Sequence, residues 1–571
     1  MKMQALILGV AVAVFATGCG KFASQKGVSQ NAVTGAPIGG GIIDDPAKDD
    51  EAMEAINPTV SALAEKYFGG DQTGPAKARL FRLTREQLDL TTKAVLSTNV
   101  TTSVKATMPR DPLQTNYEYS DVLSFNNANF TPYSKWVEQI AKAVLAKPTS
   151  VINCASTTPS CLETQARAFI TKAFRGAVTE ERLATYVSFY TSSVSQVGFA
   201  QATADLVDVV MSSPLYVFRE EVQTDSSGIL NPAQYLQGLS YALADSPPDR
   251  VKLSSANPVQ HLQSAEALKS SVDAVLSTPE AREKLLRFFA AWLEIKEADE
   301  FTISTTEYPE FTPAVAQAVV EETKKFLNFH LSKAAPSLKD LTQSTQSFVS
   351  DSIASIYGMN QGGLSGASPV ALDTSKRVGL FTQPAVLASH SGPTTTRLVK
   401  RGVFFTRKVM CLEIGGVPSG IDTELPDTNG QTERQKIEAV TSTGTCVGCH
   451  TYINPFGFIQ ENYSAIGKWR TTDEGQPIDS RISVNFLDEG QLNTDSPVTA
   501  LKTFTNSARF KQCFVRQLFR FYMGRTETPA DHPLLRKMFF YFAEGDQQDI
   551  LGLLKILGNS SRFAQRSEGG V

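Results

Sequence analysis

Long apolar runs are missing from most of this 571-residue chain. Beyond the N-terminal segment, no stretch approaches the roughly 18 apolar residues that a membrane-spanning helix needs. A strong excess of one charge is missing too, because 54 basic residues are balanced by 58 acidic ones. A chain with this charge balance has no overall positive potential that would attract DNA or RNA, so we expect no nucleic-acid partner.

Several motifs of common enzymes are also lacking. The sequence has no glycine fingerprint for a dinucleotide, no phosphate-binding loop, no His-Glu-x-x-His zinc site and no nucleophile elbow. It shows no internal repeat, and histidine is scarce, with five in the whole chain. These absences argue against dinucleotide-dependent, phosphate-binding-loop and His-Glu-x-x-His zinc enzymes, and a hydrolase triad stays open.

The first residues are typical of an export signal. Lys2 carries positive charge, and Ala5–Ala16 is an uninterrupted apolar or small-residue run that is too short to span a bilayer. The run ends in Ala-Thr-Gly before Cys19, which resembles the lipobox of bacterial lipoproteins. We therefore expect Cys19 to carry a diacylglycerol anchor, with ordinary secretion as the alternative. Gly20, in place of Asp, favours the outer membrane by this resemblance, facing the periplasm or the cell surface.

The rest of the chain is predicted to be mainly helical and divided into several domains. Helix signals include a capping box at Thr84 and Gln87, and starts at Thr131-Pro132 and Thr312-Pro313. Two further helices are expected at 509–523 and 548–557, and the best strand at 482–487. The expected parts are a signal peptide (1–18), a flexible tether (19–57), an N-terminal helical domain (58–150), a central helical domain (151–360), a small cytochrome-c-like module (361–480) and a C-terminal helical domain (481–571).

The sequence Cys446-Val-Gly-Cys449-His450 carries the clearest chemistry. Cys-x-x-Cys-His is the attachment signature of c-type haem: the two thiols bind the vinyl groups covalently, and the histidine becomes the proximal iron ligand. A redox disulfide is one alternative, although no strand-helix-strand setting is visible around the motif. A zinc site is another, although it needs further Cys or His ligands. We expect one covalent haem c, since the export signal places the chain where such haems are attached.

From this motif onward the chain resembles the planctomycete cytochrome family, multidomain exported proteins of largely unknown function. Residues 446–470 read CVGCHTYINPFGFIQENYSAIGKWR, and the family pattern is matched at Pro455, Gly457, Phe458, Glu461, Asn462, Gly467 and Arg470. Asn454 and Ser464 stand where the family has Asp, which alters charge near the motif. Shorter similarities in family order cover most of the mature chain. They include Arg82 to Glu86, Ala173 to Arg175, Leu239 to Tyr241, Trp292-Leu293, Lys400 to Gly402 and Gly524-Arg525. The resemblance implies an architecture and a haem, and no settled reaction.

Four other cysteines are expected to form disulfides. Cys154 and Cys161 flank a short polar loop, an arrangement typical of a structural bridge in an exported protein. With the haem cysteines assigned, Cys411 and Cys513 remain and flank the haem module. We predict that they pair, with two buried free thiols as the alternative.

The second axial side of the iron has three candidate ligands, Met523, Met410 and His390. Met523 lies downstream of the motif, as the distal methionine does in small monohaem cytochromes c. Met410 adjoins Cys411, and His390 stands in a polar segment that is typical of a surface. The remaining alternative is an iron that has no second ligand from the protein.

These features predict an outer-membrane monohaem cytochrome that exchanges electrons with an unidentified redox protein. Two alternatives stay open at this stage. One is a haem enzyme of peroxidase or oxygenase type with an open iron position, so that enzymatic activity is undecided. The other is a surface interaction scaffold whose haem is structural.

Overall fold

The computed structural model describes residues 46–70, 76–96, 99–114, 117–118, 122–222, 228–416, 425–426, 428, 430–545, 548–560 and 565–567. The expected signal peptide, the lipidation site at Cys19 and most of the expected tether lie outside these residues. Within the described ranges, no helix is long and apolar enough to cross a membrane. The prediction of a mainly helical fold is confirmed.

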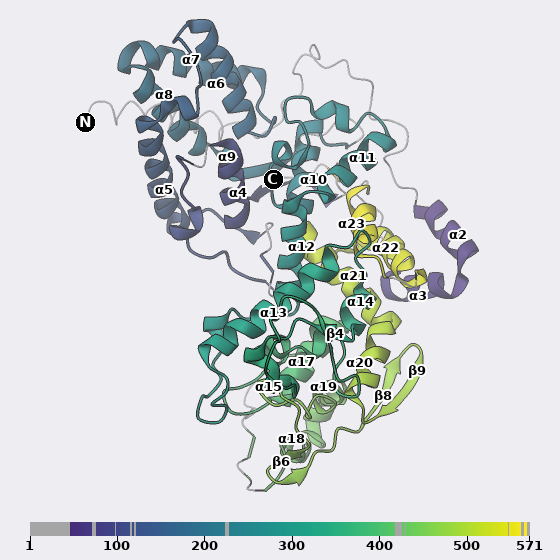
Figure 1. Ribbon diagram of the computed structural model, residues 1–571. Coiled ribbons are helices and arrows are strands. Elements are labelled where there is room, and N and C mark those ends of the chain that lie inside the picture. Colours follow the sequence, from purple (N-terminus) through teal and green to yellow (C-terminus); the bar gives the residue numbers. More distant parts are fainter. Residues whose placement is uncertain are drawn as a thin grey trace.

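A first group of helices forms the upper left of the molecule in Figure 1. Its elements are α4 (Arg85–Val95), α5 (Asn127–Ala146), α6 (Pro159–Ala173), α7 (Glu180–Val197), α8 (Phe199–Met211) and α9 (Pro214–Val217). Their apolar faces share one core, in which Trp136 and Tyr190 are fully buried. This core runs without a break across residue 150, where the sequence suggested a domain boundary.

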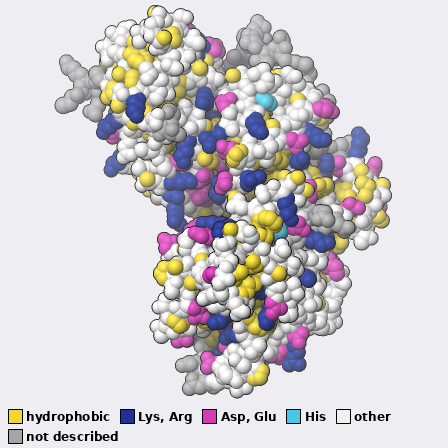
Figure 2. Space-filling model, viewed as in Figure 1, with side chains coloured by type: hydrophobic (Ala, Val, Ile, Leu, Met, Phe, Trp, Pro, Cys, Tyr) yellow, Lys and Arg dark blue, Asp and Glu magenta, His cyan; other side chains and the backbone are white. Residues whose placement is uncertain are grey.

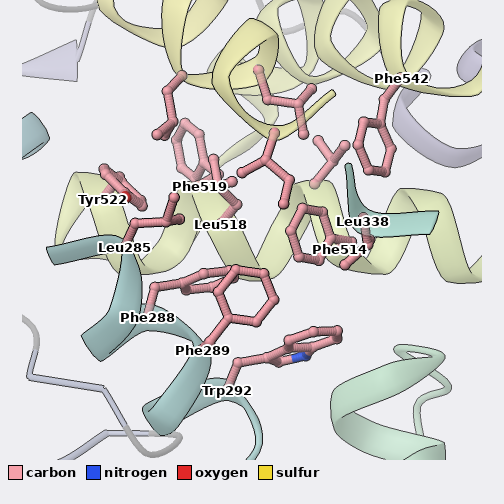
Figure 3. Close-up of a cluster of buried hydrophobic side chains, with 14 of the residues drawn as sticks. Leu285, Phe288, Phe289, Trp292, Leu338, Phe514, Leu518, Phe519, Tyr522 and Phe542 are labelled. Carbon is pink, nitrogen blue, oxygen red and sulfur yellow. The ribbon is translucent and has the colours of Figure 1, made fainter. Parts of the chain in front are cut away.

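A second group extends from the centre of Figure 1 to α2 and α3 at the right and α20 below, and it combines segments from both ends of the chain. Its elements are α2 (Pro46–Ile56), α3 (Pro58–Phe68), α10 (Pro232–Ala244), α11 (Ala265–Leu276), α12 (Pro279–Trp292), α20 (Pro497–Asn506), α21 (Ala508–Met523), α22 (His532–Glu544) and α23 (Ile550–Gly558). Figure 3 shows Phe288, Phe289 and Trp292 of α12 packed against Phe514 of α21. The C-terminal helices therefore complete a core that the middle of the chain begins.

A third group forms the lower part of Figure 1. Its elements are α13 (Pro313–Leu331), α14 (Leu338–Gln343), α15 (Ala354–Tyr357), α16 (Pro384–Ser389), α17 (Leu398–Phe404), the π-helical turn η9 (Phe405–Val409), α18 (Glu433–Thr441), the 3-10 turn η10 (Gly444–Cys446) and α19 (Val447–Phe458). The apolar side chains of α17, η9 and α19 join the same core as α12 and α21. The expected boundaries at 360 and 480 thus do not separate independent cores.

Strands are short and occur in pairs. Antiparallel pairs are β2 (Arg79–Arg82) with β3 (Phe218–Glu221), β4 (Gln346–Ser347) with β5 (Val370–Ala371), β6 (Thr472–Asp473) with β7 (Gln476–Pro477), and β8 (Ile482–Leu487) with β9 (Gly490–Thr494). The pair β1 (Ala76–Lys77) with β10 (Arg566–Ser567) is parallel. The strand predicted at 482–487 is confirmed as β8. Acidic and basic side chains are interspersed over the face in Figure 2, in keeping with the balanced charge of the sequence.

Local sequence signals located several helix ends. The Thr84–Gln87 capping box is present at α4, and Thr312 caps α13, both as predicted. The start predicted at Thr131-Pro132 was wrong, because α5 begins at Asn127. The side chain of Asn126 accepts hydrogen bonds from the backbone N–H groups of Ala128 and Asn129, which fixes the earlier start.

Residues 46–56 were expected to be tether and are instead the helix α2. Two of their acidic residues form ion pairs with α22: Asp50 lies 2.8 Å from Arg536, and Asp49 lies 3.0 Å from Lys537. Met53 is buried beside these contacts. Long-range ion pairs thus order a segment whose composition alone suggested flexibility.

Candidate haem-binding site

The Cys-x-x-Cys-His motif lies at the start of α19. Cys446 closes η10, and Cys449 and His450 lie in the first turn of the helix. Both cysteines are half-buried and unpaired, whereas the other four cysteines in the described part of the chain form disulfides. A spacing of three residues in helical backbone places two side chains on one face. The motif therefore presents two reduced thiols and an imidazole at the same end of one helix.

A chain of hydrogen bonds holds the imidazole of His450. Its Nδ1 atom lies 2.8 Å from Oδ1 of Asn454, and Nδ2 of Asn454 donates to Oγ1 of Thr441 at 3.0 Å. The hydroxyl of Thr441 in turn donates to the carbonyl of Ile437 at 2.7 Å. Since that hydroxyl uses its proton on Ile437, it accepts from the amide, and the amide oxygen must face His450. This assigns the proton of the imidazole to Nδ1 and leaves Nε2 as the basic nitrogen.

The helix α18, which carries Thr441, is itself fixed at its N-terminus by distant acidic side chains. The carboxylate of Glu433 accepts from the backbone N–H of Leu398 at 2.7 Å, and the N–H of Glu433 donates to Asp473 at 2.7 Å. Glu461 accepts from the N–H of Arg434 at 3.4 Å. Acidic groups stabilise the positive end of a helix dipole. Residues of the 461–473 segment thus hold the helix that orients His450.

Burial raises the pKa of Glu461 to about 7, and the charge of Asp473 adds to the rise. A hydrogen bond from Arg434 and the charge of Arg470 act in the opposite direction. The side chain of Glu461 is fully buried. The protonation of this carboxyl group therefore changes near neutral pH, at the base of the helix that leads to His450.

The motif helix packs unusually closely against α17. An added Cβ atom at Gly402 would lie 2.3 Å from the carbonyl oxygen of Ile453, and one at Gly457 would lie 2.4 Å from that of Leu398. Only glycine permits such an approach of two backbones. The two pairs run in opposite order along the chain, so α17 and α19 are antiparallel. Because η9 continues α17, it runs toward the end of α19 that carries the Cys-x-x-Cys-His motif.

A buried arginine joins these helices to the loop that follows them. Arg401 of α17 is 1% exposed and donates to the carbonyls of Tyr463 and Ser464, each at 2.7 Å. The same guanidinium donates to Gln460 at 3.1 Å. Backbone carbonyls therefore supply most of the hydrogen bonds of a charge buried beside the motif helix.

Aromatic rings form the core under the second half of α19. The ring of Phe456 lies 5.9 Å from Phe405, 5.6 Å from Phe486 and 5.0 Å from Phe504, centroid to centroid. Tyr452 lies 5.2 Å from Phe486. Such edge and offset ring contacts fix side chains firmly. The imidazole is thus carried by a rigid helix.

Two apolar side chains in or near the motif are exposed to solvent. Val447, between the two cysteines, is 38% exposed, and Val440 of α18 is 43% exposed. Val440 immediately precedes Thr441, whose hydroxyl binds Asn454 of the motif helix. Exposed valines beside a motif for covalent attachment suit a site that a flat apolar ring covers.

The three candidates for the second axial ligand lie in different surroundings. Met410 is fully buried and follows η9, at the end of α17 directed toward the motif. Met523 ends α21 and lines a cavity of about 550 Å³ together with residues of α4, α10 and α12. These are not elements that the motif helix packs against. The antiparallel arrangement therefore favours Met410 over Met523.

His390 is not the surface residue that its polar sequence setting suggested. It is 3% exposed, its Nε2 atom lies 2.9 Å from the carbonyl oxygen of Leu293, and its ring stacks on Phe404 at 3.9 Å. Burial lowers its pKa to about 3, so the ring is neutral. A ring enclosed in this way, like the fully buried side chain of Met410, must change its packing before it binds a metal. The described residues contain no cluster of three or more Cys, His, Asp or Glu that would hold an ion.

Both expected disulfides are formed in the structure. Cys154 and Cys161 are joined at 2.08 Å across the polar loop before α6, and Cys411 and Cys513 at 2.06 Å. The second bridge connects the residue after Met410 to the middle of α21. It ties the segment next to the motif to the central core.

Comparison with known families places two domains on the chain. Residues 377–473 match the family described as PSCyt3, protein of unknown function (DUF1588), and residues 230–359 match PSD4, protein of unknown function (DUF1592). Both are typical of planctomycete cytochrome c-like proteins, as the resemblance implied. No curated protein and no solved structure matches the chain. The first match contains the motif helix, α17, α18 and every residue of the hydrogen-bond chain to His450.

Sequence reasoning missed the roles of Asn454 and Thr441. The position of Asn454, four residues after His450, is a usable signal once a helix is expected there. No helix was predicted from the sequence over 447–458, and Pro455 lies inside α19. Thr441 carried no signal, because its contact depends on how α18 packs.

Proposed function

We propose that this protein is a monohaem c-type cytochrome that transfers electrons. The observation that carries the proposal is the pairing of two free thiols with an imidazole whose Nε2 atom is left basic by Asn454. Covalent haem attachment requires reduced cysteines in this spacing, and proximal ligation requires that nitrogen. The residues present fit the group.

Each residue of the motif has a distinct role in this proposal. Cys446 and Cys449 form the two thioether links, and His450 binds the iron through Nε2. A bound haem c supplies a one-electron iron couple. Asn454 keeps the proton at Nδ1, which fixes the tautomer and the plane of the ring. Thr441 holds the amide of Asn454 in the orientation that accepts this proton.

The position of the motif favours electron exchange with another protein. Cys446, Cys449 and His450 are all half-buried, and Thr445 and Val447 beside them are exposed. An attached redox group therefore lies close to the surface while the helix beneath it is rigid. Such a site suits brief contact with a redox partner better than enclosure of a substrate.

The experiment is an absorption and potentiometric study of protein matured in a host that attaches haem c. We expect a low-spin, six-coordinate iron that is reduced and reoxidised reversibly, and Met410→Ala should convert it to a high-spin form. Met523→Ala, in the remote cavity, is the matched control and should leave the spectrum unchanged. A high-spin wild-type iron, unaffected by either variant, would contradict electron transfer and favour the enzyme alternative.

The proposal includes a lipid anchor on Cys19 at the outer membrane. Its support is the small-residue run before that cysteine, since a diacylglycerol buries many methylene groups and holds a soluble domain at a membrane. Replacing Cys19 with Ala should move the protein from the membrane fraction to the soluble fraction. Retention of the variant in the membrane at the wild-type level would place the anchor elsewhere.

A further inference from the structure

A second pocket, distinct from the motif, is dominated by arginine. It has a volume of about 450 Å³ and lies between α3, α21 and the segment that follows η9. Its lining residues are Tyr67, Arg407, Cys411, Leu412, Glu413, Ile414, Arg509, Gln512, Arg516 and Arg520. Four of these ten side chains are arginines and one is acidic. No role in the proposed electron transfer uses this pocket.

The arrangement of the arginines follows from the helix. Arg509, Arg516 and Arg520 are seven and four residues apart on α21, which places them on one face. Arg407 reaches the pocket from the opposite wall, on η9. The disulfide between Cys411 and Cys513 joins the two walls covalently. The two walls are therefore held together covalently, and three of the four arginines come from one helix.

One carboxylate neutralises the inner pair of arginines. Glu527 lies 2.6 Å from Arg516 and 2.6 Å from Arg520, and it contacts Arg520 through both of its oxygens. Burial favours the protonated acid, but the hydrogen bonds and charges of the two arginines outweigh burial and hold the pKa of Glu527 at about 2. The single carboxylate of Glu527 is thus the shared ion-pair partner of both Arg516 and Arg520.

The outer pair binds backbone carbonyls in place of carboxylates. Arg407 donates to Gly415 at 3.0 Å and Arg509 donates to Phe486 at 3.3 Å. Asp488, whose charge interacts with that of Arg509, is already engaged by Lys66 and Tyr67, and Glu489 accepts a hydrogen bond from the backbone N–H of Ala508. Among the residues that the structure describes, neither of these two guanidinium groups has a carboxylate partner. The lining of the pocket itself holds four arginines and one acidic side chain, Glu413.

We propose that this pocket binds a dianionic group, either a phosphate or a pair of carboxylates. Guanidinium groups donate in a planar fork that matches both, and like charges held together in one concavity are costly without a counter-anion. Gln512, which is 2% exposed, adds an amide to the same wall. Two sources share this chemistry: a free anion, and the two propionates of a haem attached at the neighbouring motif. The pocket begins one residue after Met410; the second source rests on the proposed function, and the first does not.

The test is a calorimetric titration of inorganic phosphate into the full chain at constant ionic strength. We expect saturable binding that weakens by about tenfold or more in an Arg407→Gln/Arg509→Gln variant, since charge-assisted contacts are the strongest hydrogen bonds available. Arg481→Gln is the matched control, because that arginine is 77% exposed and lies outside the pocket. Equal loss in the control, or binding that never saturates, would overturn the proposal. Arg407→Gln alone is the second variant, since this exposed side chain tolerates substitution if the double variant fails to fold.

The two sources are separated by comparing haem-loaded protein with a Cys446→Ala/Cys449→Ala chain that carries no haem. Equal phosphate binding in both supports a free anion as the occupant. Binding confined to the haem-free chain supports the propionates, because the attached group already fills the site. Absence of binding in both, with the normal helical circular dichroism spectrum, would overturn the proposal.

Discussion

His450 and Asn454 are joined through Nδ1 and Oδ1 at 2.8 Å, one turn apart on the same helix. In the family that this chain resembles, the position of Asn454 is usually Asp. The amide is neutral where a carboxylate would be charged, so the contact to His450 in this chain is made by an uncharged group. That difference should set the electronic character of the imidazole.

Replacing Asn454 with Asp should therefore lower the reduction potential of the attached haem. A carboxylate draws the Nδ1 proton more strongly, raises the electron density at Nε2 and favours ferric iron. Potentiometric titration measures the change. Asn493→Asp, on the exposed strand β9, controls for added negative charge. Equal potentials in the two variants would show that the contact does not tune the iron.

Replacing Thr441 with Val should loosen the orientation of His450. The variant removes the acceptor for Nδ2 of Asn454, and we expect a loss of about 1 kcal/mol in the free energy of unfolding. Urea unfolding measures the loss, and the ferric spectrum should broaden at the same time. Thr164→Val, an exposed helix position, should cost less. An unchanged spectrum would separate Thr441 from the site.

Removing the Cys411–Cys513 bridge should destabilise the protein more than removing Cys154–Cys161. The first closes a loop of 102 residues and the second a loop of seven. In the chain-entropy model these loops are worth up to about 4.7 and about 2.4 kcal/mol respectively. Denaturant unfolding of the two double-alanine variants compares them. An equal loss would mean that strain or packing, and not loop length, determines the contribution.

His390 should make the fold sensitive to mild acid. Its pKa is about 3 in the folded chain, because of burial, against an ordinary value of 6.5, so the unfolded chain binds the proton first as pH falls. The stability that this ring contributes is complete above pH 6.5 and is lost progressively toward pH 3. Between pH 7 and pH 5 the wild type should lose about 2 kcal/mol that a His390→Gln variant does not lose. Parallel pH slopes for the two proteins would contradict this assignment.

The sequence predicted those helix starts and strands that are determined by interactions between nearby residues. The capping box at Thr84, the helix start at Pro313 and the strand β8 depend on nearby residues, and each was placed correctly. The helix α2 could not be predicted, because its acidic residues find their partners on α22 more than 480 residues away. The burial of His390 was missed for the same reason, since Phe404 and Leu293 enclose it from separate segments.

In the candidate site, too, some residues could be predicted from the sequence and others depend on packing. The two cysteines and His450 are readable from spacing alone, whereas the support for the imidazole requires α18 to pack beside α19. The order of the distal candidates also depends on packing. Met523 follows the motif in the chain but lies in a remote cavity, and Met410 precedes the motif but lies at the matching end of an antiparallel helix pair.

The most direct test of the account is the intact mass of the mature protein after denaturation. Protein made with working haem-attachment machinery should retain the mass of one haem, and a Cys446→Ala/Cys449→Ala variant made in parallel should not. Each single-cysteine variant should keep at most one thioether link. A wild-type mass that equals the bare polypeptide, in a host that loads a known cytochrome c in the same culture, would contradict the central claim.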